Sequence, residues 1–390
     1  MNNGLESITS LISGLKPQLQ KLSLAIWEHP ETAWKEHFAV SEAKKYLETV
    51  GFEVETGCFG VETAFKCEYG NGDSPCVAIA AEYDALPEIG HGCGHNLICV
   101  AGIAAFIALA EMLKKSGIPG KVILLGTPAE EGAGGKVRML ANGCLDGVDA
   151  AMMIHPNSTT AIDNGSTANC GLQVTFHGKA AHAAGSPEKG VNALDAVNLL
   201  FAAVGAFRQQ MPDCALIHGI ITNGGAAPNI IPDTAVCRFY LRTSSEAYAP
   251  ELERRFRNMV KGAELMTDCT AEIVPFREAY RSRKPNAAMN EEYAKNMESL
   301  GQTVIRPARS GKGSSDFGNF SQVVPGIHPY FAITAEKASF PAHSIPFRDA
   351  SATEYAFDNA MNGAASMAQT LWRFITDDSF RAEVRQDFEK

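Results

Sequence analysis

Three short apolar runs constrain the fold more than any other feature of this sequence. They occupy 75–83 (PCVAIAAEY), 120–128 (GKVILLGTP) and 149–156 (DAAMMIHP), and a segment with apolar residues at helical spacing, 96–114, lies between the first two. Short apolar runs that alternate with helices are typical of parallel strands buried on both faces. The sequence therefore predicts an α/β fold with a mostly parallel sheet flanked by helices.

A second pattern begins near residue 168. Strand-like and helix-like segments follow one another in the order β-α-β-β-α-β, which is the order of a ferredoxin-like α+β domain. At 390 residues the chain also exceeds the size at which one hydrophobic core usually stops growing. We therefore expect a main domain formed by 1–167 and 285–390, interrupted by an inserted domain at 168–284. Helical spacing further predicts one long final helix at 349–375.

The charge and the cysteine pattern narrow the class of protein. The chain carries 34 basic and 44 acidic residues, a net charge of −10, and such a field does not attract nucleic acid or anionic membranes. Its N-terminus lacks the pattern of a secretory signal, and no uninterrupted apolar run is long enough to span a bilayer. Ten scattered cysteines suit a chain that stays reduced. We expect a cytoplasmic protein that acts on a small molecule, without a nucleic-acid or membrane partner.

Residues of the kinds that bind metals follow each of the three apolar runs. The carboxyl ends of parallel strands meet at one edge of a sheet, where the ligands of open α/β sheets bind. Side chains that follow different runs are therefore expected to gather at that edge. These are Asp84, Cys93 and His95 after the first run, Glu130 and Glu131 after the second, and His155 in the third.

The spacing of these residues indicates a metal site. Cys93 and His95 lie two apart in a glycine-flanked loop, and thiolate with imidazole suits zinc or another borderline transition metal. Of the adjacent Glu130 and Glu131, one can bind metal while the other contacts water, as metal-assisted hydrolysis requires. His343, in the loop SFPAHSIPF, could complete the set, although the sequence does not show that it lies nearby. The alternatives are a polar turn with an incidental cysteine and a solvated acidic turn.

Eight segments spread over nearly the whole chain resemble one known family. They are similar to the co-catalytic di-metal metallopeptidases of the aminoacylase and glutamate carboxypeptidase type, and within them to the amidohydrolase branch. Asn96 stands where much of that branch has aspartate, which favours its p-aminobenzoyl-glutamate hydrolase and β-alanyl-lysine dipeptidase-like members. The segments are WEHPETAWKE, EYDALPEIGHGCGHN, EEGAGG, MIHP, GKAAHAAGSPEKGVNALDA, GGAAPNIIPD, GSSDFGN and PAHSIPF.

The resemblance implies a role for each of the metal-type residues. Glu130 looks like the general base that activates a bridging water and then protonates the leaving amine, while Asp84 would orient a metal-binding histidine. Two divalent ions are implied, zinc or manganese first, with nickel or cobalt as further candidates. The residues that would bind them are Cys93, His95, Glu131, His155 and His343.

The resemblance also implies contacts to the substrate. His182 in GKAAHAAG is similar to a family histidine that helps to stabilise the oxyanion, often from the partner subunit of a dimer. Asn229 in APNIIPD matches a residue that lines the substrate site. Arg242 and Arg309 could each bind a substrate carboxylate through two hydrogen bonds. The alternative for all four is an ordinary polar or charged surface residue.

These implications lead to one expected function. We expect a metal-dependent amidohydrolase that cleaves the amide bond of N-acyl amino acids or small dipeptide-like substrates, such as aminobenzoyl-glutamate or β-alanyl dipeptides. The inserted domain is expected to act as a lid and to form a homodimer. The alternatives are a catalytically silent binding or partner subunit of the same fold, and a carboxypeptidase that acts on longer peptides. The silent subunit is disfavoured because Glu130 and every expected ligand are present.

Overall fold

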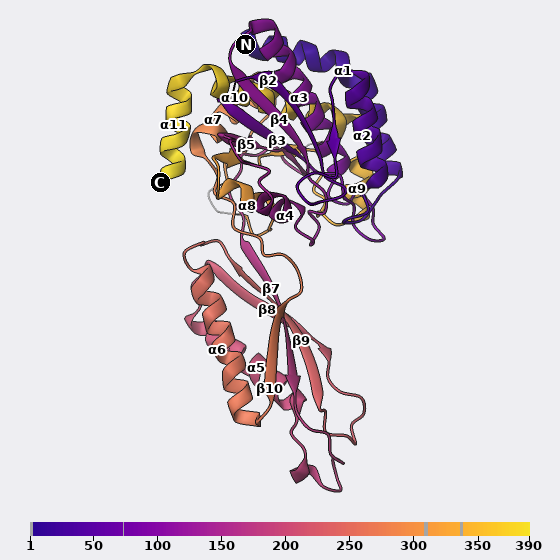
Figure 1. The fold of residues 1–390 in the computed structure, drawn as a ribbon, viewed down its shortest axis with the longest axis vertical. Helices are drawn as coiled ribbons and strands as arrows, with labels where there is room; N and C mark the ends of the chain where they lie inside the picture. Colours follow the sequence, from indigo (N-terminus) through magenta and orange to yellow (C-terminus); the bar gives the residue numbers. More distant parts are fainter. Residues whose placement is uncertain (1–2, 73, 308–310, 336–337) are drawn as a thin grey trace. The chain divides into compact units, whose positions relative to one another are not determined.

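The computed structural model describes residues 3–72, 74–307, 311–335 and 338–390. The chain forms two compact units (Figure 1). The second unit consists of Ser166–Ser282 and Lys312–Ser314. The first unit consists of Met1–Gly165, Arg283–Gly311 and Ser315–Lys390.

The division differs in two details from the one expected at residues 168 and 284. Both boundaries fall two residues earlier, and the short segment Lys312–Ser314 groups with the second unit rather than with the first. This segment pairs with the start of the second unit, because the backbone N–H of Thr167 donates to the Gly313 carbonyl at 2.9 Å. Such a long-range pairing leaves no local signal in the sequence.

The first unit is built on a six-stranded sheet with the order β1-β2-β4-β3-β5-β11. The strands β3, β4, β5 and β11 are parallel, and β1 and β2 are antiparallel at one edge. All six residues of β3 are buried, as the apolar run predicts for a central strand. The mostly parallel sheet is thus confirmed. Its strands are β1 (Glu55–Thr56), β2 (Phe65–Asn71), β3 (Cys76–Ala81), β4 (Gly120–Gly126), β5 (Ala150–Met152) and β11 (Gly326–Ile327).

Helices and a small second sheet complete the first unit. The two strands of the small sheet, β6 (His155–Asn157) and β12 (Tyr330–Ala332), are parallel. Packing of α1 and α10 against α3 places α3 at the centre of the unit. The helices are α1 (Asn3–Glu28), α2 (His37–Thr49), α3 (His95–Ser116), α4 (Gly135–Ala141), α7 (Ala287–Ser299), α8 (Phe317–Ser321), α9 (Ile345–Ala350), α10 (Glu354–Thr376) and α11 (Asp378–Glu389).

Among the described residues, α3 alone is long and apolar enough to cross a membrane. Its most apolar stretch is 89% buried within the protein, which is typical of a core helix. Gly102 allows α3 to approach β3 closely, since a Cβ atom there would lie 2.9 Å from the Cβ of Ala81. The apolar composition of α3 is therefore explained by packing inside the first unit.

The final helix expected at 349–375 is confirmed over 354–375, which lies in α10, but its expected start at residue 349 is wrong. The chain forms two helices there, α9 and α10, separated by Ser351–Thr353. The break has a local cause, because the Thr353 side chain accepts a hydrogen bond from the Ala356 N–H and so caps the start of α10. A further helix, α11, follows, and the Asp377 side chain caps it in the same way.

The second unit is a four-stranded antiparallel sheet with the order β10-β7-β9-β8. With its two helices, this is the ferredoxin-like arrangement that the sequence predicts. Side chains alternate along β9, and one face of the sheet packs on α5 and α6 to form a core separate from that of the first unit. The elements are β7 (Ala168–His177), α5 (Ala193–Phe207), β8 (Ala215–Asn223), β9 (Thr234–Thr243), α6 (Ala249–Thr267) and β10 (Thr270–Pro275).

Candidate metal centre and active site

The carboxyl ends of β3 and β4 and the start of α3 bring metal-type side chains together in the first unit. Two of these residues, Cys93 and Glu131, form one trio with His343 from the segment before α9, and their ligand atoms all lie within 4.8 Å of one another. The Nε2 atom of His343 is 3.7 Å from Oε1 of Glu131. The His343 loop is fixed here because its backbone N–H donates to the Gly92 carbonyl at 3.0 Å.

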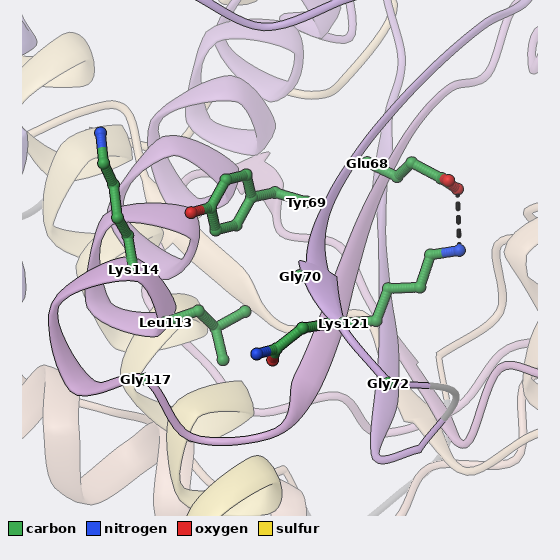
Figure 2. Close-up of a pocket in the computed structure, with 9 residues that line it drawn as sticks. Glu68, Tyr69, Gly70, Gly72, Leu113, Lys114, Gly117 and Lys121 are labelled. Carbon is green, nitrogen blue, oxygen red and sulfur yellow. Dashed lines mark ion pairs between the residues drawn. The ribbon is translucent and has the colours of Figure 1, made fainter.

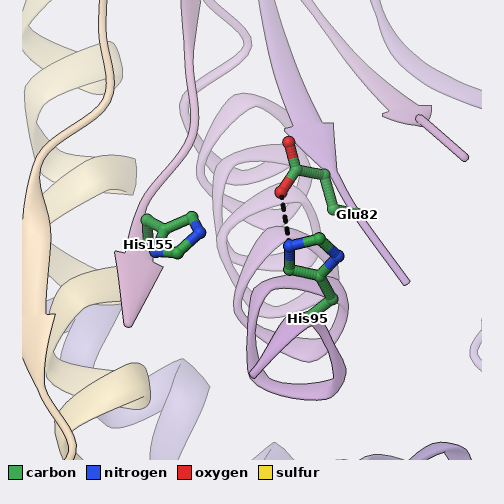
Figure 3. A group of neighbouring side chains, drawn as sticks. All are labelled: Glu82, His95 and His155. Carbon is green, nitrogen blue, oxygen red and sulfur yellow. Dashed lines mark ion pairs between the residues drawn. The ribbon is translucent and has the colours of Figure 1, made fainter. Parts of the chain in front are cut away.

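A second trio consists of Glu82, His95 and His155 (Figure 3), and its ligand atoms also lie within 4.8 Å of one another. The Nε2 atom of His95 is 3.4 Å from Oε2 of Glu82. The Nδ1 atom of His155 is 2.8 Å from the Pro156 carbonyl, which sets the proton on Nδ1 and leaves Nε2 as an electron-pair donor. Burial lowers the pKa of His155 to about 4, so its ring is neutral, the form that binds a metal.

The two trios are adjacent. His95 also forms a group with Glu130 and Glu131, and its Nε2 is 3.9 Å from Oε1 of Glu131. All five ligands expected from the sequence therefore lie in one pair of neighbouring trios. That these residues bind metal stays a prediction, and the two trios indicate which of them would share an ion.

Asp84 holds the two trios in place. Its Oδ1 is 3.0 Å from Nδ1 of His95, and its Oδ2 accepts a hydrogen bond of 2.9 Å from the Glu131 backbone N–H. Although burial opposes it, the Asp84 carboxylate raises the pKa of His95 well above its ordinary value. The negative charge that favours a proton on His95 equally favours a cation beside its other nitrogen. These contacts are compatible with the orienting role that the resemblance implies for Asp84, which stays a prediction.

Unsatisfied buried atoms test whether a metal fits this site. Among the described residues, Oε2 of Glu82, Nε2 of His95 and Oε1 of Glu131 are buried and accept or donate no hydrogen bond. A buried polar atom without a partner destabilises a folded protein, on the order of 1–3 kcal/mol each. Cations held by the two trios would give each of these atoms a partner, and one thiolate with imidazoles and carboxylates is a donor set for borderline divalent ions.

Glu130 lies beside the trios with its side chain buried. Burial and then the charges of Glu131, Glu82 and Asp316 raise its pKa well above the ordinary value. The turn that precedes it is held by Glu36, whose Oε1 accepts a 2.9 Å hydrogen bond from the Ala129 N–H. A carboxyl with a raised pKa next to a metal-type site is suited to general acid and base work.

Known proteins share both the sequence pattern and the fold of this chain. The family model for peptidase family M20/M25/M40 matches residues 78–371, which is most of the chain. The chain belongs to this peptidase family. It is therefore a hydrolase of peptide or amide bonds, as the resemblance of its motifs implies.

Two relatives show where this chain lies within the peptidase family. The chain is 36% identical over 386 residues to the Xaa-Arg dipeptidase of Mus musculus, covering 95% of this chain and 89% of that protein. It is also 36% identical over 283 residues to one of the subunits of the p-aminobenzoyl-glutamate hydrolase of Escherichia coli, covering 68% of this chain and 58% of that relative. The p-aminobenzoyl-glutamate hydrolase likeness expected from the motifs is thus confirmed.

Solved structures share the fold. A dinuclear metal-binding peptidase of the same family from Bacillus subtilis has a TM-score of 0.70 at 20% identity, covering 93% of this chain and 99% of that one. The aminobenzoyl-glutamate utilization protein from Klebsiella pneumoniae has a TM-score of 0.69 at 21% identity, covering 93% of this chain and 96% of that one. At these identities the likeness concerns the fold.

The other expected site residues of this peptidase lie in the second unit. His182 is exposed, and its Nδ1 accepts hydrogen bonds from the N–H groups of Ala184 and Gly185 at 3.2 and 3.0 Å. The neutral ring therefore carries its proton on Nε2, as a donor to an oxyanion requires. Asn229 lies nearby, since its carbonyl accepts a 3.0 Å hydrogen bond from the Ala183 N–H.

Arg242 is half-buried on the sheet of the second unit. Its Nε donates to His218 at 3.2 Å and its Nη1 to the Ser314 hydroxyl at 3.1 Å. Burial and then the neighbouring charge of Arg277 lower the pKa of Arg242. Within the described residues, neither arginine has a carboxylate at ion-pair distance, so this pair of cations is uncompensated. Arg309, the other expected carboxylate contact, lies outside the described residues.

A pocket of about 430 Å³ lies elsewhere in the first unit (Figure 2). It opens at the C-terminal end of α3, whereas His95 is the first residue of that 22-residue helix. At about 1.5 Å per residue the two ends are roughly 30 Å apart. The pocket is therefore separate from the candidate metal centre. Residues around this pocket include Glu68, Tyr69, Leu113, Lys114 and Lys121.

Proposed function

We propose that this chain is a two-metal amidohydrolase that cleaves the amide bond of a small N-acyl amino acid or dipeptide. The observation that carries the proposal is the pair of adjacent trios, one containing Cys93 and Glu131 and the other His95 and His155. The dinuclear metal-binding relative from Bacillus subtilis supports two ions per chain. Because a thiolate favours softer divalent ions, we propose zinc or manganese, with nickel or cobalt also compatible.

The chain's own residues then divide the work of hydrolysis. Two divalent ions in the trios would lower the pKa of a bound water and polarise the amide carbonyl. Glu130 takes the proton of the attacking water and delivers it to the leaving amine nitrogen, and its raised pKa lets it hold that proton between the two steps. Asp84 keeps His95 in one orientation throughout. His182, with its proton on Nε2, donates to the oxyanion in our proposal.

We propose that Arg242 binds the substrate carboxylate. Its support is the uncompensated pair that Arg242 forms with Arg277, since two guanidinium groups without an acid favour an anion between them. Xaa-Arg dipeptidase and p-aminobenzoyl-glutamate hydrolase are both named for substrates that end in an amino acid. We propose a substrate of that kind, bound with Asn229 as a further contact, and a cytoplasmic site of action.

We also propose a homodimer formed by the second unit. Strand β8 is an edge strand, and it exposes Leu216, Ile220 and Ile221. A long edge strand with exposed apolar side chains invites pairing with another chain. A second copy of β8 is the partner that a two-fold axis would supply.

The first test is Glu130→Gln, with metal content and turnover measured together. We expect the variant to keep both ions and to lose about 10²- to 10⁴-fold in kcat on a panel of N-acyl amino acids, aminobenzoyl-glutamate and dipeptides. The control is Glu68→Gln, the same exchange on β2, which should have the metal content and the kcat of the native protein. A native chain without metal and without turnover after reconstitution would overturn the proposal and favour a silent binding subunit. Turnover of long peptides only would favour a carboxypeptidase.

A further inference from the structure

We propose that Glu82 is itself a metal ligand, the third protein ligand of the ion held by His95 and His155. We further propose that the buried Lys136 and Asp316 orient the Glu82 carboxylate toward that ion. The inference rests on the proposed function and adds to it a ligand and its support, neither of which was expected from the sequence. The inference follows from the different contacts of the two carboxylate oxygens of Glu82.

The two oxygens of Glu82 have different surroundings, although the side chain is fully buried. Its Oε1 accepts a hydrogen bond of 2.5 Å from Nζ of Lys136. Its Oε2 has no hydrogen-bond partner within the described part of the chain and points to His95, with 3.4 Å between Oε2 and Nε2 (Figure 3). One oxygen is therefore anchored and the other is presented to the space that His155 also faces.

Lys136 is an unusual anchor because its side chain is also fully buried. Its Nζ donates to Oδ1 of Asp316 at 2.7 Å, and its backbone N–H donates to Oδ2 of the same carboxylate at 3.0 Å. Asp316 thus fixes Lys136 by both its side chain and its backbone. The rigid chain of contacts runs from Asp316 through Lys136 to Oε1 of Glu82.

The charges of this cluster favour a cation on its free side. Two carboxylates, of Glu82 and Asp316, surround one ammonium group, so the three side chains carry one excess negative charge. An oxygen of Glu130 lies within 4.8 Å of oxygens of both carboxylates, so the free side of the cluster is lined by a further acidic side chain. A buried excess charge requires compensation. Oε2 of Glu82 takes no part in the ion pair with Lys136 and faces Nε2 of His95 at 3.4 Å, where a metal ion would take the place of a proton on His95.

The test is calorimetric titration of the metal-free protein with zinc or manganese, with cobalt absorption as a second readout. The native chain should bind two ions. In Glu82→Gln we expect the affinity for one ion to fall by at least about 10- to 100-fold, the effect of losing even an indirect contact to a metal site. The other ion, next to Cys93, should keep its affinity and its cobalt–thiolate absorption band.

Matched controls come from the partly exposed pair Glu68–Lys121, whose charged atoms lie 3.0 Å apart beside the pocket of Figure 2. Glu68→Gln and Lys121→Met repeat the same exchanges far from the trios and should leave both affinities unchanged. Circular dichroism checks that each variant is folded. Should Glu82→Gln misfold because Lys136 is left short of an acid, the double variant Glu82→Gln/Lys136→Met removes both charges together.

The outcomes separate this inference from the proposed function. Loss of one ion in folded Glu82→Gln, or in the folded double variant, supports the inference. Two ions bound with native affinity show that Glu82 only neutralises Lys136 and overturn it, while the two-metal function stands. Loss of both ions from a folded variant contradicts the assignment to one site. If the native chain binds no metal, the proposed two-metal function is itself wrong.

Discussion

At the scale of single residues, the state of Cys93 decides how metal binding depends on pH. Burial raises the pKa of the Cys93 thiol well above its ordinary value, so the metal-free protein holds that proton at neutral pH. The thiolate is the form that binds metal. Metal binding must therefore release the proton.

We expect the affinity for metal to rise about tenfold per pH unit for each proton released, and to weaken as pH falls. Calorimetry in buffers of different ionisation enthalpy measures the number of protons released. Cys93→Ala should release at least one proton fewer than the native chain. Equal proton release by the two proteins would show that Cys93 is not a ligand.

Arg242 supplies a second prediction at this scale. Replacing it with methionine removes the charged hydrogen bonds proposed for the substrate carboxylate, a loss of about 1.5–3 kcal/mol. We expect KM to rise about 10- to 100-fold, with kcat less affected. Arg238 is a matched control because it lies on the same strand, exposed and bonded to Gln173. If Arg242→Met and Arg238→Met have equal KM values, Arg242 does not bind the substrate.

The limits of sequence-based prediction are clear from individual residues. Cys93, His95 and Glu131 could be expected to gather because each follows a strand, and parallel strand ends meet at one edge. Glu82 also follows a strand directly, but it was not expected at the site, since a lone acidic residue there is ordinarily solvated; Lys136 lies in a helix and gave no such signal. Only the fold shows that both are fully buried.

At the scale of elements, the contact between α3 and β3 keeps the start of α3, and so His95, in register with the strand ends. Gly102 lies at this contact, and an added Cβ would lie 2.9 Å from Ala81. We expect Gly102→Ala to lower the free energy of unfolding by about 1–3 kcal/mol, because overpacking outweighs the gain in helix propensity. Denaturant unfolding measures it.

Gly262 on α6 is the matched control, because no atom of the described residues lies within 4 Å of an added Cβ there. Gly262→Ala should instead stabilise its helix by up to about 1 kcal/mol. Effects of the same sign at both positions would mean that packing on β3 does not explain Gly102.

The sequence predicted most elements but not how the last helices are divided. Apolar spacing continues through Ser351–Thr353, so periodicity alone extends one helix across the break. The break depends on a side-chain cap by Thr353, and a threonine within a periodic segment is a weak signal. The ferredoxin-like domain was easier to predict, because its strands and helices follow one another along the sequence in the order β-α-β-β-α-β.

At the scale of the whole molecule, the separate core of the second unit implies that it folds by itself. Leu172, Val174 and Phe239 belong to a cluster formed by this unit alone. We expect the fragment 166–282 to unfold cooperatively, with near-native circular dichroism. A fragment that is unfolded in isolation would show that the short segment Lys312–Ser314 or the first unit is needed for its stability.

The same unit determines the oligomeric state in our proposal. Leu216 and Ile220 are 48% and 65% exposed on edge strand β8, and lysine on an edge strand discourages pairing. We expect Leu216→Lys/Ile220→Lys to convert a dimer into a monomer in sedimentation experiments, while Val323→Lys, in the first unit, leaves the dimer intact. If the double variant stays dimeric, the dimer does not form through β8. If it becomes monomeric and also loses turnover while retaining both metals, then each active site depends on its partner subunit, as the oxyanion role proposed for His182 across a dimer would require.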